Sequence, residues 1–261
     1  MILRIKLVII IKISIKYILS ILIILFFWFL AALVTKTQII PPPASVFKSL
    51  IKLRVELSIH MLASLRRIVF GVGSAFIVAV PAGLMIGRFK VLDSYLAPFI
   101  YLAYPIPKIA FLPIVLLFFG LGDLAKVFLI ALIVFFQILV HTRDAAKSID
   151  QKLILSVKSL GVSKVQLFWH LILPASLPRI FTAIRISLGT AVAVLFFTET
   201  FATSEGLGFF IMDAWTRVNY SEMFAGIMAL SFLGLILFLI IDFIERLVCP
   251  WIFLEEKKNK E

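Results

Sequence analysis

The sequence predicts an all-α integral membrane protein with six transmembrane helices. Of its 261 residues, 62% are hydrophobic and 15% are charged, and the mean hydropathy is +1.14. Soluble domains are about 45–50% apolar and about 25% charged, so this chain is too apolar for that class. Six stretches approach the roughly 20 apolar residues that a helix needs to cross a bilayer. A transmembrane barrel would need alternating segments of about ten residues, which the sequence lacks.

The chain begins with a basic segment, residues 1–16, which precedes an apolar run at residues 17–35. This run is too long for a typical signal-peptide core, and no convincing cleavage site follows it, so we predict a retained first transmembrane helix. Residues 36–67 form the expected first extracytoplasmic segment. Within it, the prolines at 41–43 stop any helix, and the apolar spacing over residues 44–57 favours an amphipathic helix along the membrane interface.

Residues 68–250 contain the other five expected spans and are predicted to form one membrane-embedded core. Gly71, Gly73 and Gly83 are small residues at which helices can approach closely, and we interpret them as packing positions. A charged tail, residues 251–261, follows the core. The five spans are predicted at residues 68–87, 95–119, 124–141, 179–203 and 223–247.

The span at residues 95–119 is unusual because it contains several prolines, which must bend or break a helix. Broken backbone at membrane depth is tolerated where it lines a cavity or is buried in protein. Lys108 lies in the middle of this segment, and an intramembrane lysine is costly enough to suggest a function. It could instead mark a helix break near an interface and extend its ammonium toward water. The residues leave both interpretations open.

The long polar segment at residues 142–178 is predicted to form two helices joined at a glycine. The first helix is expected at residues 145–160, and Gly161 would end it, as glycine does where φ is positive. Ser163 stands three residues before a glutamine, which is the pattern of a capping box for a second helix at residues 164–171.

The two prolines that close this segment, Pro174 and Pro178, are expected to end the second helix and begin the next span. Its exposed face should mix lysines with bulky apolar side chains, a mixture that favours a protein partner. The alternative is an interfacial segment that holds lipid. The bulky residues of this face are Val162, Leu167, Phe168 and Trp169.

Lysine and arginine set the orientation of membrane proteins, because they are enriched in short cytoplasmic loops. They are more numerous in residues 1–16, 142–178 and 251–261, together with the short turn after residue 87, than in the other connections. We therefore expect both termini and the 142–178 loop in the cytoplasm. The net charge of +12 is explained by these loops and their contact with anionic lipid. Nucleic-acid binding is excluded because no soluble basic domain is present.

Catalysis would require a constellation such as HExxH, a Ser–His pair or paired carboxylates at membrane depth. Glu199 is a lone carboxylate, and His60, His141 and His170 are scattered. The one cysteine, Cys249, cannot form an intramolecular disulfide, and no cluster has the spacing of metal ligands. We expect no metal or cofactor in this chain. A membrane-embedded enzyme and a membrane scaffold are the alternatives to a transport protein.

The pattern Gly161, nine residues, Leu171, one residue, Leu173-Pro174 resembles the cytoplasmic signature loop of permease subunits of binding-protein-dependent ABC importers. The Glu-Ala-Ala triad that opens this signature is replaced by residues 155–157, Leu-Ser-Val. Three further segments, residues 64–72, 105–126 and 198–211, resemble the nitrate/sulfonate/taurine branch of that family. The resemblance covers roughly residues 40–250.

The resemblance implies a type I ABC-importer permease fold without nucleotide binding of its own, in the inner (plasma) membrane of a prokaryote. It implies two partner ATPase subunits that bind ATP and Mg, a second permease copy that makes a homodimer, and an extracytoplasmic solute-binding protein. This sequence lacks the glycine-rich phosphate loop that nucleotide binding would need, in agreement with that division of labour. The loop around Gly161 would be the coupling helix. The implied docking residues are Val157, Lys158, Ser159, Leu160, Gly161, Val162, Ser163, Lys164, Leu167 and Phe168.

The solute pathway is expected near the broken span and the second costly charge, with Pro105, Pro107, Lys108, Thr198 and Glu199 as candidates. The implied solute is a small anion such as nitrate, a sulfonate, taurine or bicarbonate, which Lys108 and Arg185 could attract. The alternative in the same branch is a pyrimidine precursor or another small organic solute.

Overall fold

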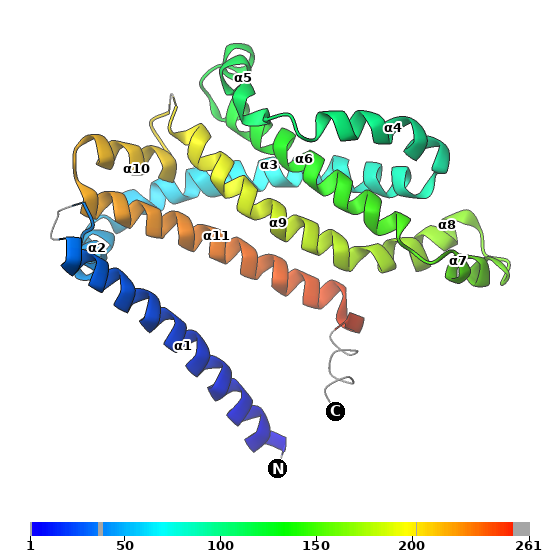
Figure 1. Ribbon diagram of the computed structural model, residues 1–261, viewed down its shortest axis with the longest axis horizontal. Helices are drawn as coiled ribbons and strands as arrows, with labels where there is room; N and C mark the ends of the chain where they lie inside the picture. The colour runs from blue at the N-terminus through cyan, green and yellow to red at the C-terminus, as the bar shows by residue number, and fades with distance from the viewer. Residues whose placement is uncertain (1, 36–38, 202, 253–261) are drawn as a thin grey trace.

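The computed structural model describes residues 2–35, 39–201 and 203–252, and every regular element within them is helical. Figure 1 shows long helices lying side by side, with short helices at both ends. The elements are α1 (Ile2–Thr35), α2 (Pro43–Lys52), α3 (Arg54–Arg88), α4 (Lys90–Ala103), η1 (Lys108–Phe111), α5 (Leu112–Phe119), α6 (Asp123–Lys147), α7 (Gln151–Lys158), α8 (Lys164–Leu167), η2 (Phe168–Ile172), α9 (Leu173–Glu199), α10 (Leu207–Thr216) and α11 (Tyr220–Val248).

Within the described residues, five helices are long and apolar enough to cross a membrane: α1, α3, α6, α11 and the continuous helix that ends in α9. A sixth span is made by α4 together with η1 and α5, which are bent by 74° across a short break. The break lies at Tyr104–Pro107, where two prolines remove backbone donors. The prediction of an all-helical protein with six spans is confirmed, with the bent pair counted as one span.

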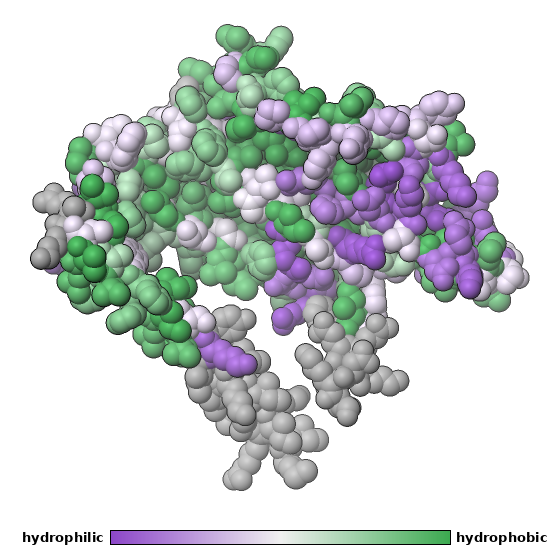
Figure 2. Space-filling model, in the orientation of Figure 1, coloured by the Kyte–Doolittle hydropathy of each residue, from purple (hydrophilic) through white to green (hydrophobic). Residues whose placement is uncertain are grey.

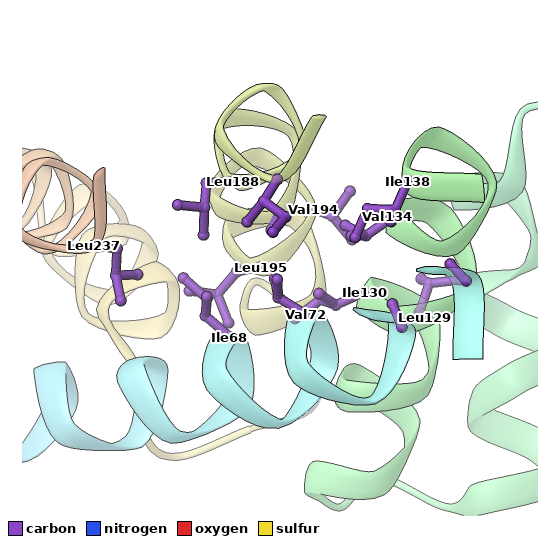
Figure 3. Close-up of a cluster of buried hydrophobic side chains, with 14 of the residues drawn as sticks. Ile68, Val72, Leu129, Ile130, Val134, Ile138, Leu188, Val194, Leu195 and Leu237 are labelled. Carbon is purple, nitrogen blue, oxygen red and sulfur yellow. The ribbon is translucent and has the colours of Figure 1, made fainter. Parts of the chain in front are cut away.

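The core lies between α3, α6, α9 and α11 (Figure 3). Branched aliphatic side chains from each helix meet there, and the helices are tied together by apolar burial and close packing. The residues labelled in the figure are Ile68 and Val72 of α3, Leu129, Ile130, Val134 and Ile138 of α6, Leu188, Val194 and Leu195 of α9, and Leu237 of α11.

A seam of small residues lets α3 approach α6 closely. A Cβ atom added at Gly83 would lie 2.8 Å from the carbonyl oxygen of Leu139, and one added at Gly71 would lie 2.9 Å from Cβ of Ile130. Gly71 and Gly83 are therefore packing positions, as expected from small residues between membrane helices. Gly73 is not, because nothing lies within 4 Å of the equivalent point.

The first span, α1, stands away from the bundle (Figure 1), and none of its Ile18–Thr35 window is buried. Its contacts are at the end that leads to α2. Trp28 stacks on Phe224 with ring centroids 5.8 Å apart, and its indole N–H donates to the carbonyl of Pro41 at 3.1 Å. The remaining apolar surface of α1 must be covered by lipid or by another protein.

Several helix boundaries differ from the sequence prediction, among them both ends of α9, which spans Leu173–Glu199 instead of residues 179–203. The interfacial helix α2 ends at Lys52, and α3 begins at Arg54, so the second half of the predicted extracytoplasmic segment 36–67 belongs to the span helix. No glycine or proline interrupts residues 54–67, so nothing stops that helix before the membrane. Similarly, α6 continues to Lys147, beyond the predicted end at residue 141, so the predicted helix 145–160 is divided between α6 and α7.

Candidate functional site

A helical hairpin formed by α7 and α8 projects from one end of the bundle (Figure 1). The carboxylate of Asp150 accepts the backbone N–H of Lys152 at 2.8 Å and so caps the start of α7. After α7, Gly161 takes φ = +77°, a left-handed conformation that side chains with a Cβ atom disfavour. Two short helices hinged at Gly161 are therefore confirmed.

The second arm of the hairpin begins with the predicted capping box. The Ser163 hydroxyl oxygen accepts the N–H of Gln166 at 3.2 Å, and the Gln166 side-chain oxygen accepts the N–H of Ser163 at 2.8 Å. The chain then passes through the π-helical turn η2 directly into α9. The expectation that Pro174 and Pro178 end the helix is wrong, because Pro174 occupies the first turn of α9 and the wider π turn precedes it.

The hairpin has its own small core and an exposed apolar surface. Ile154, Leu167 and Ile172 are buried together inside it. On the outside, apolar side chains lie on the same two arms as the exposed lysines at 152, 158 and 164, where Figure 2 shows hydrophilic residues gathered around apolar ones. The exposed fractions are 62% for Leu155, 79% for Leu160, 66% for Val165 and 60% for Trp169.

Ionic contacts connect the base of the hairpin to the bundle. Asp93 of α4 pairs with Arg143 and, at 2.7 Å, with Lys147, both near the end of α6. Arg179 of α9 donates to the hydroxyl of Ser148, just after α6. These contacts tie the end of α6, from which the hairpin departs, to α4 and α9.

Lys108 lies at the break itself. Its ammonium donates to the carbonyls of Ala103 at 2.9 Å, Tyr104 at 3.0 Å and Ile106 at 3.4 Å, and lies 4.4 Å from the ring centre of Phe136. The carbonyls of Ala103 and Tyr104 lie at the C-terminus of α4, where they lack helical partners, and that of Ile106 lies in the following turn. A cation at a helix C-terminus is favourable. Of the two interpretations of Lys108, the contacts favour the helix-break marker.

Two cavities lie along the broken span. The larger, of about 760 Å³, separates α4 from α6 near the hairpin and is lined by residues such as Asp93, Tyr101 and Arg143. The smaller, of about 290 Å³, lies at the break and includes Lys108. Tyr104 lines both, so they are neighbours on one face of the molecule. Of the predicted pathway residues, Lys108 lines the smaller cavity and Pro105 the larger, and Pro107 begins the turn η1.

Glu199 has a different environment from the one expected. It is 0% exposed, and its carboxylate accepts from Arg67 at 2.6 Å and from the Ser64 hydroxyl at 2.9 Å. Arg67, 3% exposed, also pairs with Asp123 at 2.7 Å and donates to the carbonyl of Glu205 at 2.8 Å. The cluster joins α3 to the start of α6 and the end of α9.

The same cluster satisfies the first backbone donors of α10. The N–H of Gly206 donates to His60 at 3.1 Å, that of Leu207 to Ser64 at 2.8 Å, and that of Gly208 to Glu199 at 2.9 Å. A carboxylate at a helix N-terminus is favourable. Glu199 thus anchors α10.

Thr198 is also buried, and its hydroxyl donates to the carbonyl of Leu195 at 2.9 Å. Arg185, expected as an anion receptor, instead pairs with Asp242 at 2.6 Å and with Glu245. Both placements argue against direct solute contact by these side chains.

The family model for the binding-protein-dependent transport system inner membrane component matches residues 79–253. This chain belongs to that family. It is a permease, the membrane component of an ABC importer. The resemblance read from the signature loop is confirmed.

Curated relatives of this permease include a taurine permease and a nitrate permease. The taurine transport system permease protein TauC of Escherichia coli (strain K12) is 32% identical over 219 residues, which cover 81% of this chain and 80% of TauC. The nitrate import permease protein NrtB of Synechocystis sp. is 31% identical over 194 residues, 74% of this chain and 70% of NrtB. These matches confirm the resemblance to the nitrate/sulfonate/taurine branch.

A chain of the MetNI methionine ABC transporter, solved in inward-facing conformations, has the same fold. The match has a TM-score of 0.61 at 18% sequence identity and covers 76% of this permease and 97% of that chain. The predicted type I importer fold is confirmed by this similarity.

The predicted docking residues of this permease fall into buried, half-buried and exposed groups around the small core of the hairpin. Leu167 is buried inside this core, so it stabilises the hairpin and is not part of its exposed surface. The sequence prediction missed Leu155 and Val165 as exposed apolar residues. For Leu155 the reason is that the helical phase of α7 depends on its start after Asp150. The half-buried members are Val157, Val162 and Phe168, and the exposed ones are Lys158, Ser159, Leu160, Gly161, Ser163 and Lys164.

Proposed function

We propose that this permease forms half of the pathway for a small anionic solute and that two partner ATPases dock on its α7–α8 hairpin. The observation that carries the docking proposal is the exposed apolar surface of that hairpin beside lysines, at the end of the bundle where α4, α6 and α9 are tied together. Apolar centres with a polar rim are typical of protein interfaces. ATP and Mg would be bound by the ATPases.

The proposed orientation places the hairpin and both termini in the cytoplasm. The lysines of the hairpin lie at the end of the bundle that Figure 2 shows as hydrophilic, which fits the enrichment of basic residues on the cytoplasmic side. An extracytoplasmic solute-binding protein would then dock at the opposite end, where α2 and α10 lie (Figure 1).

A second copy of the permease is proposed to cover the broken span. The face around Tyr104–Pro107 presents irregular backbone, Lys108 and the ion pair of Asp93 with Arg143. Such groups are tolerated at membrane depth only against protein or water, because lipid cannot hydrogen-bond to them. Two such faces around a two-fold axis would enclose a pathway between them.

The proposed solute is taurine, an alkanesulfonate, nitrate or bicarbonate, as supported by the taurine and nitrate permeases among the relatives. A pyrimidine precursor is the alternative, supported by a formylaminopyrimidine permease that is 30% identical over 222 residues.

The docking proposal is tested with two matched substitutions of exposed valines. Val165 of the hairpin is 66% exposed, and Val218, at the opposite end between α10 and α11, is 64% exposed. Val165→Asp should reduce co-purification with an ATP-binding-cassette subunit of the same genome about tenfold or more, because a carboxylate would replace an apolar contact at the interface centre.

Val218→Asp should leave that co-purification unchanged. Equal recovery of the ATPase with both variants would refute docking on the hairpin.

A further inference from the structure

The larger cavity along the broken span, about 760 Å³ in volume, lies between α4 and α6. Ile100 is the only buried residue of α4, so most of that helix does not pack against the bundle. Tyr104 and Pro105 line the cavity and also belong to the face that we assign to the solute pathway. A ligand on that face can therefore reach the cavity.

Polar and apolar groups are separated along this cavity. Its polar end, near the hairpin, is lined by Asp93 and Ser94 of α4 and by Arg143 and Lys147 of α6. The neighbouring turns of both helices line it with apolar groups, over the roughly 10 Å by which α4 rises from Ser94 to Tyr101. These apolar residues are Ala97, Pro98, Ile100 and Val140.

Lys147 is the cation of the polar end that has donors left for a ligand. An ammonium has three N–H donors. Within the described part of the chain, this one donates only to Asp93, at 2.7 Å, and the side chain is 56% exposed. Arg143, by contrast, is held by Asp93 and, at 3.1 Å, by Asp144, and is 16% exposed. The exposed hydroxyl of Ser94 has no hydrogen-bond partner among the described residues.

The arrangement suits an anion that carries an apolar chain. Two cations and one carboxylate line the polar end, and oxyanions accept strongly from ammonium and hydroxyl donors. Nitrate would use the polar end alone. An alkyl chain would also cover the apolar walls, which is worth about fourfold in affinity for each methylene that is fully buried.

We propose that this cavity binds an organic oxyanion. The anionic head lies at Lys147 and Ser94, and the apolar chain lies against Pro98, Ile100 and Val140. Two sources share this chemistry, an alkanesulfonate solute and the headgroup phosphate of an anionic phospholipid. The assignment to solute rests on the proposed import function, and it makes the pathway selective for organosulfonates over nitrate.

The test measures equilibrium binding of butanesulfonate and of nitrate to the permease–ATPase complex in nanodiscs of phosphatidylcholine, which has no net charge. The wild-type complex should bind butanesulfonate at least tenfold more tightly than nitrate. Lys147→Gln should weaken butanesulfonate binding about tenfold, as expected for the loss of a hydrogen bond to a charged group, while Asp93 keeps Arg143 as its partner. Lys90→Gln should leave the binding unchanged, because this exposed lysine of α4 does not line the cavity.

A second pair of variants tests the apolar walls. Ala97→Phe should abolish butanesulfonate binding, because the larger side chain occupies the space of the alkyl chain. Leu96→Phe changes the preceding position of α4, which does not line the cavity, and should bind as the wild type does. Equal affinities of the wild-type complex for the two probes, or undiminished butanesulfonate binding by Lys147→Gln or Ala97→Phe, would overturn the site.

Native mass spectrometry of complexes from bilayers with added phosphatidylglycerol distinguishes the two sources. Phosphatidylglycerol that is retained by Lys90→Gln but not by Lys147→Gln would assign the site to a lipid headgroup. Equal retention by both variants, with butanesulfonate binding as predicted, would assign it to solute. A complex that does not assemble refutes the proposed function, whereas an assembled complex that does not prefer butanesulfonate refutes only the site.

Discussion

Single residues with costly charges are paired with each other in this permease. Arg67 and Glu199 are almost completely buried and in contact, and Arg67 contacts Asp123 as well. Removing one partner from such a pair leaves an uncompensated buried charge, which is far more costly than the loss of an exposed ion pair.

We predict that Arg67→Met lowers the free energy of unfolding by about 3–5 kcal/mol, because Glu199 loses its cation. Its neighbour Arg66, whose side chain is 55% exposed, pairs with the same Asp123, and Arg66→Met should cost about 0–1 kcal/mol. Thermal unfolding of the two purified variants and the wild type in detergent measures both losses of stability.

The double variant Arg67→Met, Glu199→Gln should recover part of the loss, because it removes the buried anion as well. Equal stability of Arg67→Met and Arg66→Met would contradict this assignment of the cluster.

The sequence identifies Lys108 and Glu199 as unusual because charge at membrane depth is costly wherever it occurs. It does not identify their partners. Arg67 and Glu199 are 132 positions apart, and no local pattern indicates which distant side chains a fold will bring together.

At the scale of the helices, α3 can approach α6 closely only where glycine, which has no side chain, lies at the contact. The seam between α3 and α6 places Gly83 against the backbone of α6, which cannot move aside as a flexible side chain could. Prolines and small residues are readable in sequence, so the broken span and part of this seam are predictable. Helix ends that no glycine or proline marks cannot be predicted in this way, and for this reason α3 and α6 extend beyond the predicted boundaries.

We predict that Gly83→Ala destabilises the permease by about 1–3 kcal/mol, as overpacking does in a well-packed interior. Gly73→Ala, on the same helix but with nothing within 4 Å of the new Cβ atom, should be neutral or stabilising by up to about 1 kcal/mol. The difference in thermal unfolding temperature between the two variants checks the prediction. A Gly83→Ala variant as stable as Gly73→Ala would show that the close approach of α3 to α6 is wrong.

At the scale of the whole molecule, the chain is incomplete without partners. The window Ile18–Thr35 of α1 has no buried residue, and the broken span leaves polar groups such as the Lys108 ammonium at its bend. The hairpin exposes five bulky apolar residues, Leu153, Leu155, Leu160, Val165 and Trp169. We propose a different cover for each of these surfaces: lipid or protein for α1, a second permease and water for the broken span, and an ATPase for the hairpin. The central claim is that the hairpin couples ATP hydrolysis by that partner to solute movement through α4.

The most direct test is the amount of taurine taken up per ATP hydrolysed in proteoliposomes that contain the permease and its ATPase, with ATP inside and the binding protein outside. Uptake by the wild type should require both ATP and the binding protein. Gly161→Val should retain hydrolysis but lose most of the uptake, because a β-branched residue disfavours φ = +77° and the hairpin must rearrange. Gly161→Asn, which tolerates that conformation, should keep most of the coupling. Normal coupled uptake with Gly161→Val would contradict the account.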